Sequence, residues 1–181
     1  MREWTEFEPR DWAFCGVFGG AGLLLPPVFH LLHLGHVFLP IYLPMFALAF
    51  LVRPFPCGLT AALVPLLSAV LTGMPPLYPP IAWVMSIELA VTTSLTSLIA
   101  SRRPNRNPLL FLLPILVVGR FLNAGLQYGA ALLMDLPAGF VAGLSFVSAW
   151  PGVVLIALTI PPFARTFQHY RPARASSPEG T

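Results

Sequence analysis

The sequence predicts an all-α integral membrane protein built as a bundle of six transmembrane helices. Hydrophobic residues make up 56% of the 181 positions and charged residues only 9%, whereas soluble domains carry about 25% charged residues. Apolar runs of spanning length, roughly 17–25 residues, alternate with short breaks rich in proline, glycine or arginine. We expect one membrane domain over residues 1–168 and a short, disordered cytoplasmic tail over 169–181.

The first three helices are expected at 12–31, 37–52 and 56–73. An acidic and aromatic N-terminus without a basic segment precedes the first helix, so no cleaved signal peptide is expected. The loop HLLHLGH (30–36) separates the first helix from the second, and Arg53 separates the second from the third. The second run is short, near the lower length limit for a membrane span.

The last three helices are expected at 80–100, 108–134 and 139–165. The proline-rich stretch GMPPLYPP (73–80) precedes the fourth helix, and an arginine-rich break separates the fourth from the fifth. The fifth run is long enough to tilt in the bilayer, and a short turn at 135–138 leads into the sixth. The 21 prolines of the chain blur several of these boundaries.

The arginines predict how the bundle is oriented. The chain has no lysine, and its arginines outside the apolar runs all fall on one side of the six-helix arrangement: Arg2, Arg10, Arg53, Arg102, Arg103, Arg106, Arg165, Arg171 and Arg174. The positive-inside rule therefore predicts a multi-pass protein whose arginine-bearing face and both termini are cytoplasmic. The net charge of +3 then reflects topology and does not predict a surface that binds nucleic acid.

Neither the cysteines nor the histidines predict a metal or cofactor site. Cys15 and Cys57 fall near helix ends on the expected cytoplasmic side, where disulfides are rare, and they lack the spacing of a metal or redox motif. His30, His33 and His36 are three residues apart around the first outer loop. A zinc site needs further ligands in a tetrahedral array. We expect these histidines to hydrogen-bond a ligand or to cap a helix end.

Two charged residues inside apolar runs, Glu88 and Arg120, are the main candidates for a functional site. Intramembrane charges usually face a bundle interior and mark a ligand or ion pathway. Glu88 is expected roughly 12 Å below the outer surface, and Arg120 roughly 18 Å above the inner surface of a core of about 30 Å. Both therefore lie at a similar depth. Asn123 and Gln127 continue the polar face of the fifth helix outward, which predicts a pocket that opens to the outside.

The outer loops and the second helix supply further candidates for this pocket. His30, Tyr42, Met74 and Tyr78 are expected to contribute aromatic or polar contacts from above a ligand held between the fourth and fifth helices. A mostly apolar pocket with a few convergent polar groups is the usual form of a small-molecule site.

A purely structural interpretation of the same residues is also open. Glu88 and Arg120 can form an ion pair that joins two helices, and Asn123 and Gln127 can act as interhelical hydrogen-bonding groups, worth about 0.6–2 kcal/mol each. A structural role does not explain why the polar row continues toward one surface only. We therefore favour a ligand site, with an ion pair that serves both purposes.

A long part of the chain resembles the substrate-binding S component of energy-coupling factor (ECF) transporters. The most specific piece is the stretch from Pro65 to Pro76, which contains Thr-Gly-Met-Pro-Pro. Shorter pieces extend the resemblance over most of the chain: Phe29, His30, Gly35, Phe38, Leu39 and Pro40, then Gly58, Glu88 to Ala90, Gly119, Arg120, Pro151 and Gly152.

The sequence departs from the family pattern in three places. Where the family commonly has Met-His-Ile-Pro, this chain has residues 41–44, so Tyr42 stands at the position of a ligand-facing histidine. A Gly-Pro turn is replaced by Arg53 and Pro54. The Ala-x-x-x-Ala coupling motif of the first helix would be represented by Gly16 and Gly20, whose spacing allows close approach of another helix.

The resemblance implies a subunit in the cell membrane of a prokaryote. It would capture a vitamin-like micronutrient from outside and deliver it through a T component and two ABC ATPase subunits. The chain has no phosphate-binding loop of its own, and no catalytic residue is expected. The competing hypothesis is a small intramembrane enzyme that acts on a lipid or isoprenoid substrate, with Glu88 or a histidine as base. No recognised catalytic constellation supports that alternative.

Overall fold

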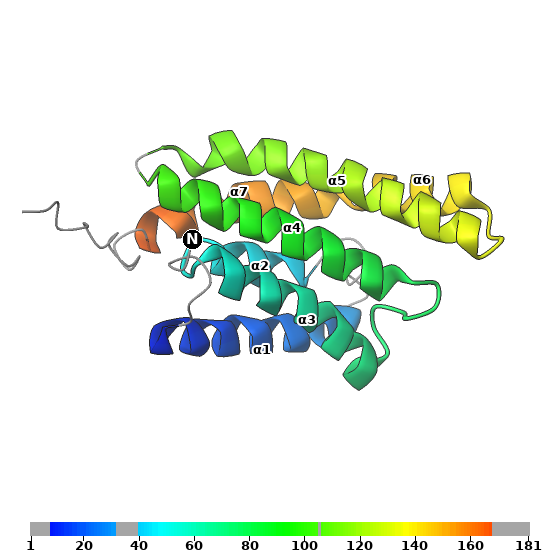
Figure 1. Ribbon diagram of the computed structural model, residues 1–181, viewed down its shortest axis with the longest axis horizontal. Coiled ribbons are helices and arrows are strands. Elements are labelled where there is room, and N and C mark those ends of the chain that lie inside the picture. The colour runs from blue at the N-terminus through cyan, green and yellow to red at the C-terminus, as the bar shows by residue number, and fades with distance from the viewer. Residues whose placement is uncertain (1–7, 32–39, 105, 168–181) are drawn as a thin grey trace, which may run out of the picture.

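A computed structural model describes residues 8–31, 40–104 and 106–167 of the chain, and in these residues it contains helices and no strand. The helices form an elongated bundle in which successive helices from α1 to α6 alternate in direction along its long axis (Figure 1). Their bounds are α1 Pro9–Leu31, α2 Tyr42–Leu48, α3 Pro54–Thr72, α4 Ile81–Arg102, α5 Pro108–Leu133, α6 Ala138–Ser148 and α7 Trp150–Phe167. The all-α class predicted from the sequence is confirmed.

Five segments in the described part of the chain are long and apolar enough to cross a membrane. Four of them correspond to α1, α3, α4 and α5, and the fifth, Ser145–Thr166, combines the end of α6 with most of α7. A helix of about 20 residues reaches across the hydrocarbon core of a bilayer. The chain is therefore a multi-pass membrane protein.

The helix predicted at 37–52 is wrong in length. Only the seven residues of α2 are helical, and residues 49–52 continue as turns; residues 37–39 lie outside the described part. The amides of Phe50 and Leu51 bond back three residues, at 3.1 and 2.9 Å, which is the tighter pattern typical of a helix end. Pro54 favours an extended residue before it, and Arg53 is extended, with φ −66° and ψ 159°. At about 1.5 Å per residue, α2 is too short to cross a bilayer.

Irregular backbone next to α2 is tolerated because it is covered by protein. The residues of the turn at 49–52 are at most 4% exposed, and the Ser97 hydroxyl of α4 donates a hydrogen bond of 2.6 Å to the carbonyl of Val52. Non-helical segments at membrane depth occur where protein or an internal cavity satisfies their polar groups. All the residues of α2 except Leu43 are buried, and this helix packs against α1, α3, α4 and α7.

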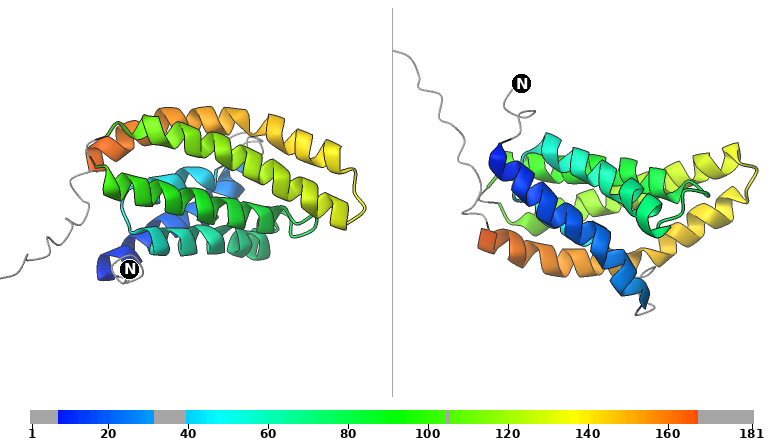
Figure 2. Two further views of the ribbon diagram at one scale, coloured as in Figure 1. Left: turned by 45° about the horizontal axis from the view of Figure 1, so that its top comes forward. Right: turned by 90° about the horizontal axis from the view of Figure 1, so that it is seen from below.

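The helix predicted at 139–165 is divided into α6 and α7. The division falls at Ala149, two residues before Pro151. A proline inside a helix removes one backbone hydrogen bond and its ring clashes with the preceding turn, which bends the helix. The two helices point in different directions in the right-hand view of Figure 2. The bend brings α6 alongside α5, with which it packs.

Small residues set the distance between α3 and α4. A Cβ atom on Gly58 would lie 2.1 Å from the Ser94 hydroxyl oxygen, so a larger residue here would displace that hydroxyl. The same Ser94 hydroxyl donates a 3.2 Å hydrogen bond to the carbonyl of Pro54. Small side chains allow the backbones of membrane helices to approach closely. This contact fixes α4, which carries Glu88, against the rest of the bundle.

The helix ends that carry arginine lie together at one end of the bundle. The start of α1, the connection between α4 and α5, and the end of α7 lie together at the left of Figure 1. The described arginines at these helix ends are Arg10, Arg53, Arg102, Arg103, Arg106 and Arg165. We refer to this end as the arginine end, and to the opposite end, with the loop 73–80, as the loop end.

We predict that the arginine end faces the cytoplasm. In a background in which Cys15 and Cys57 are replaced by alanine, a cysteine at Leu77, which is 44% exposed in the loop end, should react with an impermeant maleimide in intact cells. A cysteine at Ser177 should react only after the cells are permeabilised, because the positive-inside rule keeps the arginine side in the cytoplasm. The reverse pattern of labelling would contradict the orientation.

Candidate functional site

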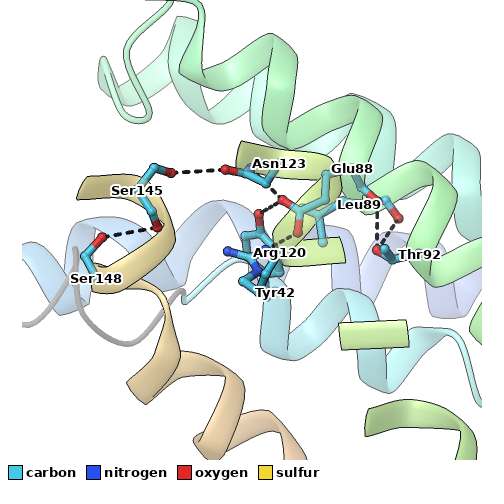
Figure 3. Close-up of polar contacts among 8 residues, drawn as sticks. All are labelled: Tyr42, Glu88, Leu89, Thr92, Arg120, Asn123, Ser145 and Ser148. Carbon is cyan, nitrogen blue, oxygen red and sulfur yellow. Dashed lines mark hydrogen bonds and ion pairs between the residues drawn. The ribbon is translucent and has the colours of Figure 1, made fainter. Parts of the chain in front are cut away.

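A buried polar cluster joins three helices near the middle of the bundle (Figure 3). The Glu88 carboxylate of α4 accepts hydrogen bonds from the hydroxyl of Tyr42 on α2 and from Nη2 of Arg120 on α5. It also accepts a bond of 2.7 Å from the amide nitrogen of Asn123 on α5. None of these four residues is more than 4% exposed. We call them the Glu88 cluster.

The local sequence of α5 brings its two polar groups to the same carboxylate. Arg120 and Asn123 are three residues apart, so they lie on the same face of the helix. Gly119 lets this face approach α4, because a Cβ atom there would lie 3.0 Å from Thr92 Cγ2 and 3.2 Å from Glu88 Oε1. The hydroxyl of Thr92 donates to the Glu88 carbonyl at 2.7 Å, so it is satisfied within α4.

Two further contacts extend the Glu88 cluster. The Ser145 hydroxyl on α6 donates a 3.0 Å hydrogen bond to the side-chain oxygen of Asn123, which ties a fourth helix to the site. The Arg120 guanidinium carbon lies 5.0 Å from the centre of the Tyr42 ring, within the range of a cation–π interaction. Sequence reasoning did not identify Ser145, because a single serine in an apolar run carries no recognisable pattern.

The Glu88 cluster is electrically balanced but retains an unused donor. Glu88 and Arg120 form a salt bridge, so their opposite charges offset one another. The Nε atom of Arg120 is buried and has no hydrogen-bond partner among the described residues. An unsatisfied buried donor is costly and is rare in folded proteins. A ligand with a hydrogen-bond acceptor would satisfy this atom without bringing an uncompensated charge into the core.

The other predicted site residues do not all lie near the Glu88 cluster. Gln127 is 3% exposed and lies one turn beyond Asn123, so the polar row of α5 does continue toward the loop end. Met74 and Tyr78 lie in the loop 73–80, where they are 38% and 70% exposed, and no hydrogen bond among the described residues connects them to the Glu88 cluster. The side chains of His30, His33 and His36 lie outside the described part of the chain.

Tyr42 belongs to the centre of the site and not to its outer cover. A helix that spans 37–52, as expected from the sequence, would have placed this residue beside the outer loops. The short α2 is instead enclosed by four other helices, and Tyr42 is 2% exposed. Its hydroxyl therefore bonds directly to Glu88.

Chemically, the Glu88 cluster is suited to binding and poorly suited to proton transfer. Both carboxylate oxygens of Glu88 are engaged, and three donors from two helices hold them. A general base must reach a substrate proton at hydrogen-bonding distance. In the described residues, no three histidine, cysteine, aspartate or glutamate side chains come together in a way that would hold a metal ion.

We predict that Arg120→Met strongly destabilises the protein and that a second change reverses most of the loss. The single variant leaves the Glu88 carboxylate buried without its cation, which should cost about 3–5 kcal/mol of unfolding free energy. The double variant Arg120→Met/Glu88→Gln has no buried charge at this site and should recover most of that stability. Unfolding in detergent measures both variants, with Arg165→Met as a control that removes an exposed cation at the arginine end. A double variant no more stable than Arg120→Met would contradict the ion-pair account.

Comparison of the chain with protein-family models, with curated proteins and with solved structures finds no match. The Glu88 cluster is the feature that any proposal has to explain, because it buries two charges in the core of a membrane protein.

Proposed function

We propose that the chain is the substrate-capture (S) subunit of an ECF-type importer. It binds a vitamin-like micronutrient from the outer face of a prokaryotic cell membrane and delivers it through a T component and two ABC ATPase subunits. The observation that carries the proposal is the buried, charge-balanced Glu88 cluster with the unused Nε donor of Arg120. The resemblance of the sequence to S components supplies the identity of the partners.

The polar row on α5 extends from Arg120 toward the loop end only. On α4, the buried hydroxyls of Thr92, Thr93 and Thr96 lie on the other side of Glu88, but each donates to a backbone carbonyl of its own helix. Toward the loop end, Asn123 and Gln127 follow Arg120 on the buried face. Toward the arginine end, the buried positions of α5 that precede Arg120 include Leu112, Ile115 and Leu116. A conducting pathway needs polar or carbonyl groups along its length. A row that ends at Arg120 fits a ligand that enters from one side and stops there.

A helix surface for a partner is available on α1. A Cβ atom on Gly16 or Gly20 would meet no described atom within 4 Å. A Cβ atom on Gly22 would lie 2.8 Å from the Val64 side chain of α3, so this glycine packs inside the bundle. The glycines of α1 therefore divide between an inner and an outer face. The outer pair would allow close approach of a T-component helix.

The alternative, an intramembrane enzyme that acts on a lipid or isoprenoid substrate, gains no support from the site. Glu88 would be its base, yet Tyr42, Arg120 and Asn123 already occupy both carboxylate oxygens. A substrate would have to displace these donors before a proton could be taken. A binding role uses the same geometry without any rearrangement of Glu88.

We predict that the ligand contacts Arg120 directly. The ligand is first identified by mass spectrometry of small molecules released from the purified protein, and its affinity is then measured for each variant. Arg120→Met/Glu88→Gln should bind at least about tenfold more weakly than wild type, because a hydrogen bond to a charged donor contributes about 1.5–3 kcal/mol. Since this double variant is expected to be stable, lost binding would not reflect misfolding. Affinity equal to that of wild type would leave the ion pair as a structural element only.

We predict that the outer glycine face of α1 holds the transport complex together. The tagged chain, purified from its native membrane, should bring with it a T component and two ATPase subunits. Gly20→Leu should abolish this association and leave ligand affinity nearly unchanged, because its side chain would block a close helix contact. Gly125→Leu is a matched control, since a Cβ atom on this glycine of α5 would also meet no described atom within 4 Å. Absence of an ATPase from the wild-type preparation would overturn the proposed function.

A further inference from the structure

A cavity of about 360 Å³ lies at the arginine end, between the last turns of α4 and the start of α5. It combines a basic part and an apolar part, and its lining residues are Arg102, Arg103 and Arg106 with Ile99, Leu110 and Phe111. A second, smaller cavity adjoins it and shares Arg103, Arg106 and Phe111. The first cavity is within the size range of small-molecule sites, roughly 300–1,000 Å³.

Among the described residues, no acidic side chain forms a salt bridge with the arginines of this cavity. The two salt bridges in the described part of the chain join Arg53 to Glu8 and Arg120 to Glu88. The three lining arginines take part in neither of them, and their side chains are exposed. Asp11, a further acidic residue at this end of the bundle, accepts a hydrogen bond from the backbone of Glu8. Within the part of the chain that the structure describes, the cavity therefore presents a cationic surface without a paired acidic group.

The position of the cavity matches the boundary between hydrocarbon and headgroups. It lies where two membrane-spanning segments end and begin, Ile81–Arg102 and Pro108–Leu133. Leu110, on its rim, is 66% exposed, and the Phe111 ring lies 5.9 Å from the Phe50 ring, which lines the adjoining cavity. An apolar wall beside a cluster of cations at this depth suits a molecule with an anionic head and a hydrocarbon tail.

We propose that this cavity binds an anionic phospholipid, with Arg102, Arg103 and Arg106 on the phosphate and Leu110 and Phe111 against the first part of the acyl chains. Guanidinium groups bind phosphate oxygens in paired, charge-assisted hydrogen bonds. Basic pockets between membrane helices on the cytoplasmic side are suited to anionic lipid headgroups. The proposal goes beyond the import function and does not depend on it.

Native mass spectrometry of the purified full-length protein in detergent tests the lipid site. Phosphatidylglycerol should remain bound under conditions that remove phosphatidylcholine. The variant R103Q/R106Q removes the two cations common to both cavities and should lower phosphatidylglycerol affinity at least about tenfold, because each loses charge-assisted hydrogen bonds. The charge-matched control R10Q/R165Q changes two other arginines at the same end and should stay within about twofold of wild type. If the double variant does not fold, the single variant R103Q provides the measurement. It should also bind phosphatidylglycerol more weakly than wild type.

Several outcomes would overturn this proposal. Equal loss of lipid in R103Q/R106Q and R10Q/R165Q would mean that the lipid responds to overall charge and not to the cavity. Equal retention of phosphatidylcholine and phosphatidylglycerol would remove the role of the arginines. Displacement of the lipid by soluble glycerol phosphate at the same concentration would indicate a site for free phosphate. Unchanged lipid binding in R103Q/R106Q, together with loss of co-purified protein subunits, would assign the arginines to a protein partner.

Discussion

Burial of the Glu88 carboxylate constrains the positions of the neighbouring helices. An ionised side chain inside a membrane bundle is stable only if it is paired and its remaining lone pairs are filled. Here the pairing group is Arg120, and the Tyr42 hydroxyl and the Asn123 amide supply the other hydrogen bonds. These donors come from α2 and α5, so α4 can hold its charge only when both helices are in place. The cluster thus ties together three helices that are far apart in the sequence.

This constraint also accounts for the unusual α2. A seven-residue helix cannot cross a bilayer, and it has little stability by itself because helix nucleation is unfavourable. Burial of its apolar residues against α1, α3, α4 and α7 stabilises it. The hydrogen bond from Tyr42 to Glu88 then fixes its position in the bundle. A polar contact in the core gives a short apolar segment one defined place, where apolar packing alone would allow several.

The class of the fold and part of the site could be predicted from the sequence, and the physical reason differs between the two. Apolar runs of spanning length identify α1, α3, α4 and α5, because the bilayer imposes that length. Glu88 and Arg120 are conspicuous because charges are rare in such runs, and the spacing of Asn123 places it on the same helix face as Arg120. The length of α2 was not predictable, because a buried helix and a spanning helix have the same apolar composition. For this reason the position predicted for Tyr42 was wrong. The exposure of Met74 and Tyr78 depends on how the loop 73–80 packs, which the sequence does not show.

The proposed function requires that the unused Nε donor of Arg120 contacts the ligand. Nitrogen NMR of the Arg120 Nε–H group detects this contact. The signal is assigned by its absence from the stable double variant Arg120→Met/Glu88→Gln and is recorded with and without the ligand released from the native protein. When ligand is added, the chemical shift of the Arg120 Nε–H group should change as expected for a new hydrogen bond, while the chemical shift of the Arg165 Nε–H group should stay the same. A ligand that binds tightly and leaves the Arg120 signal where it was would contradict the claim.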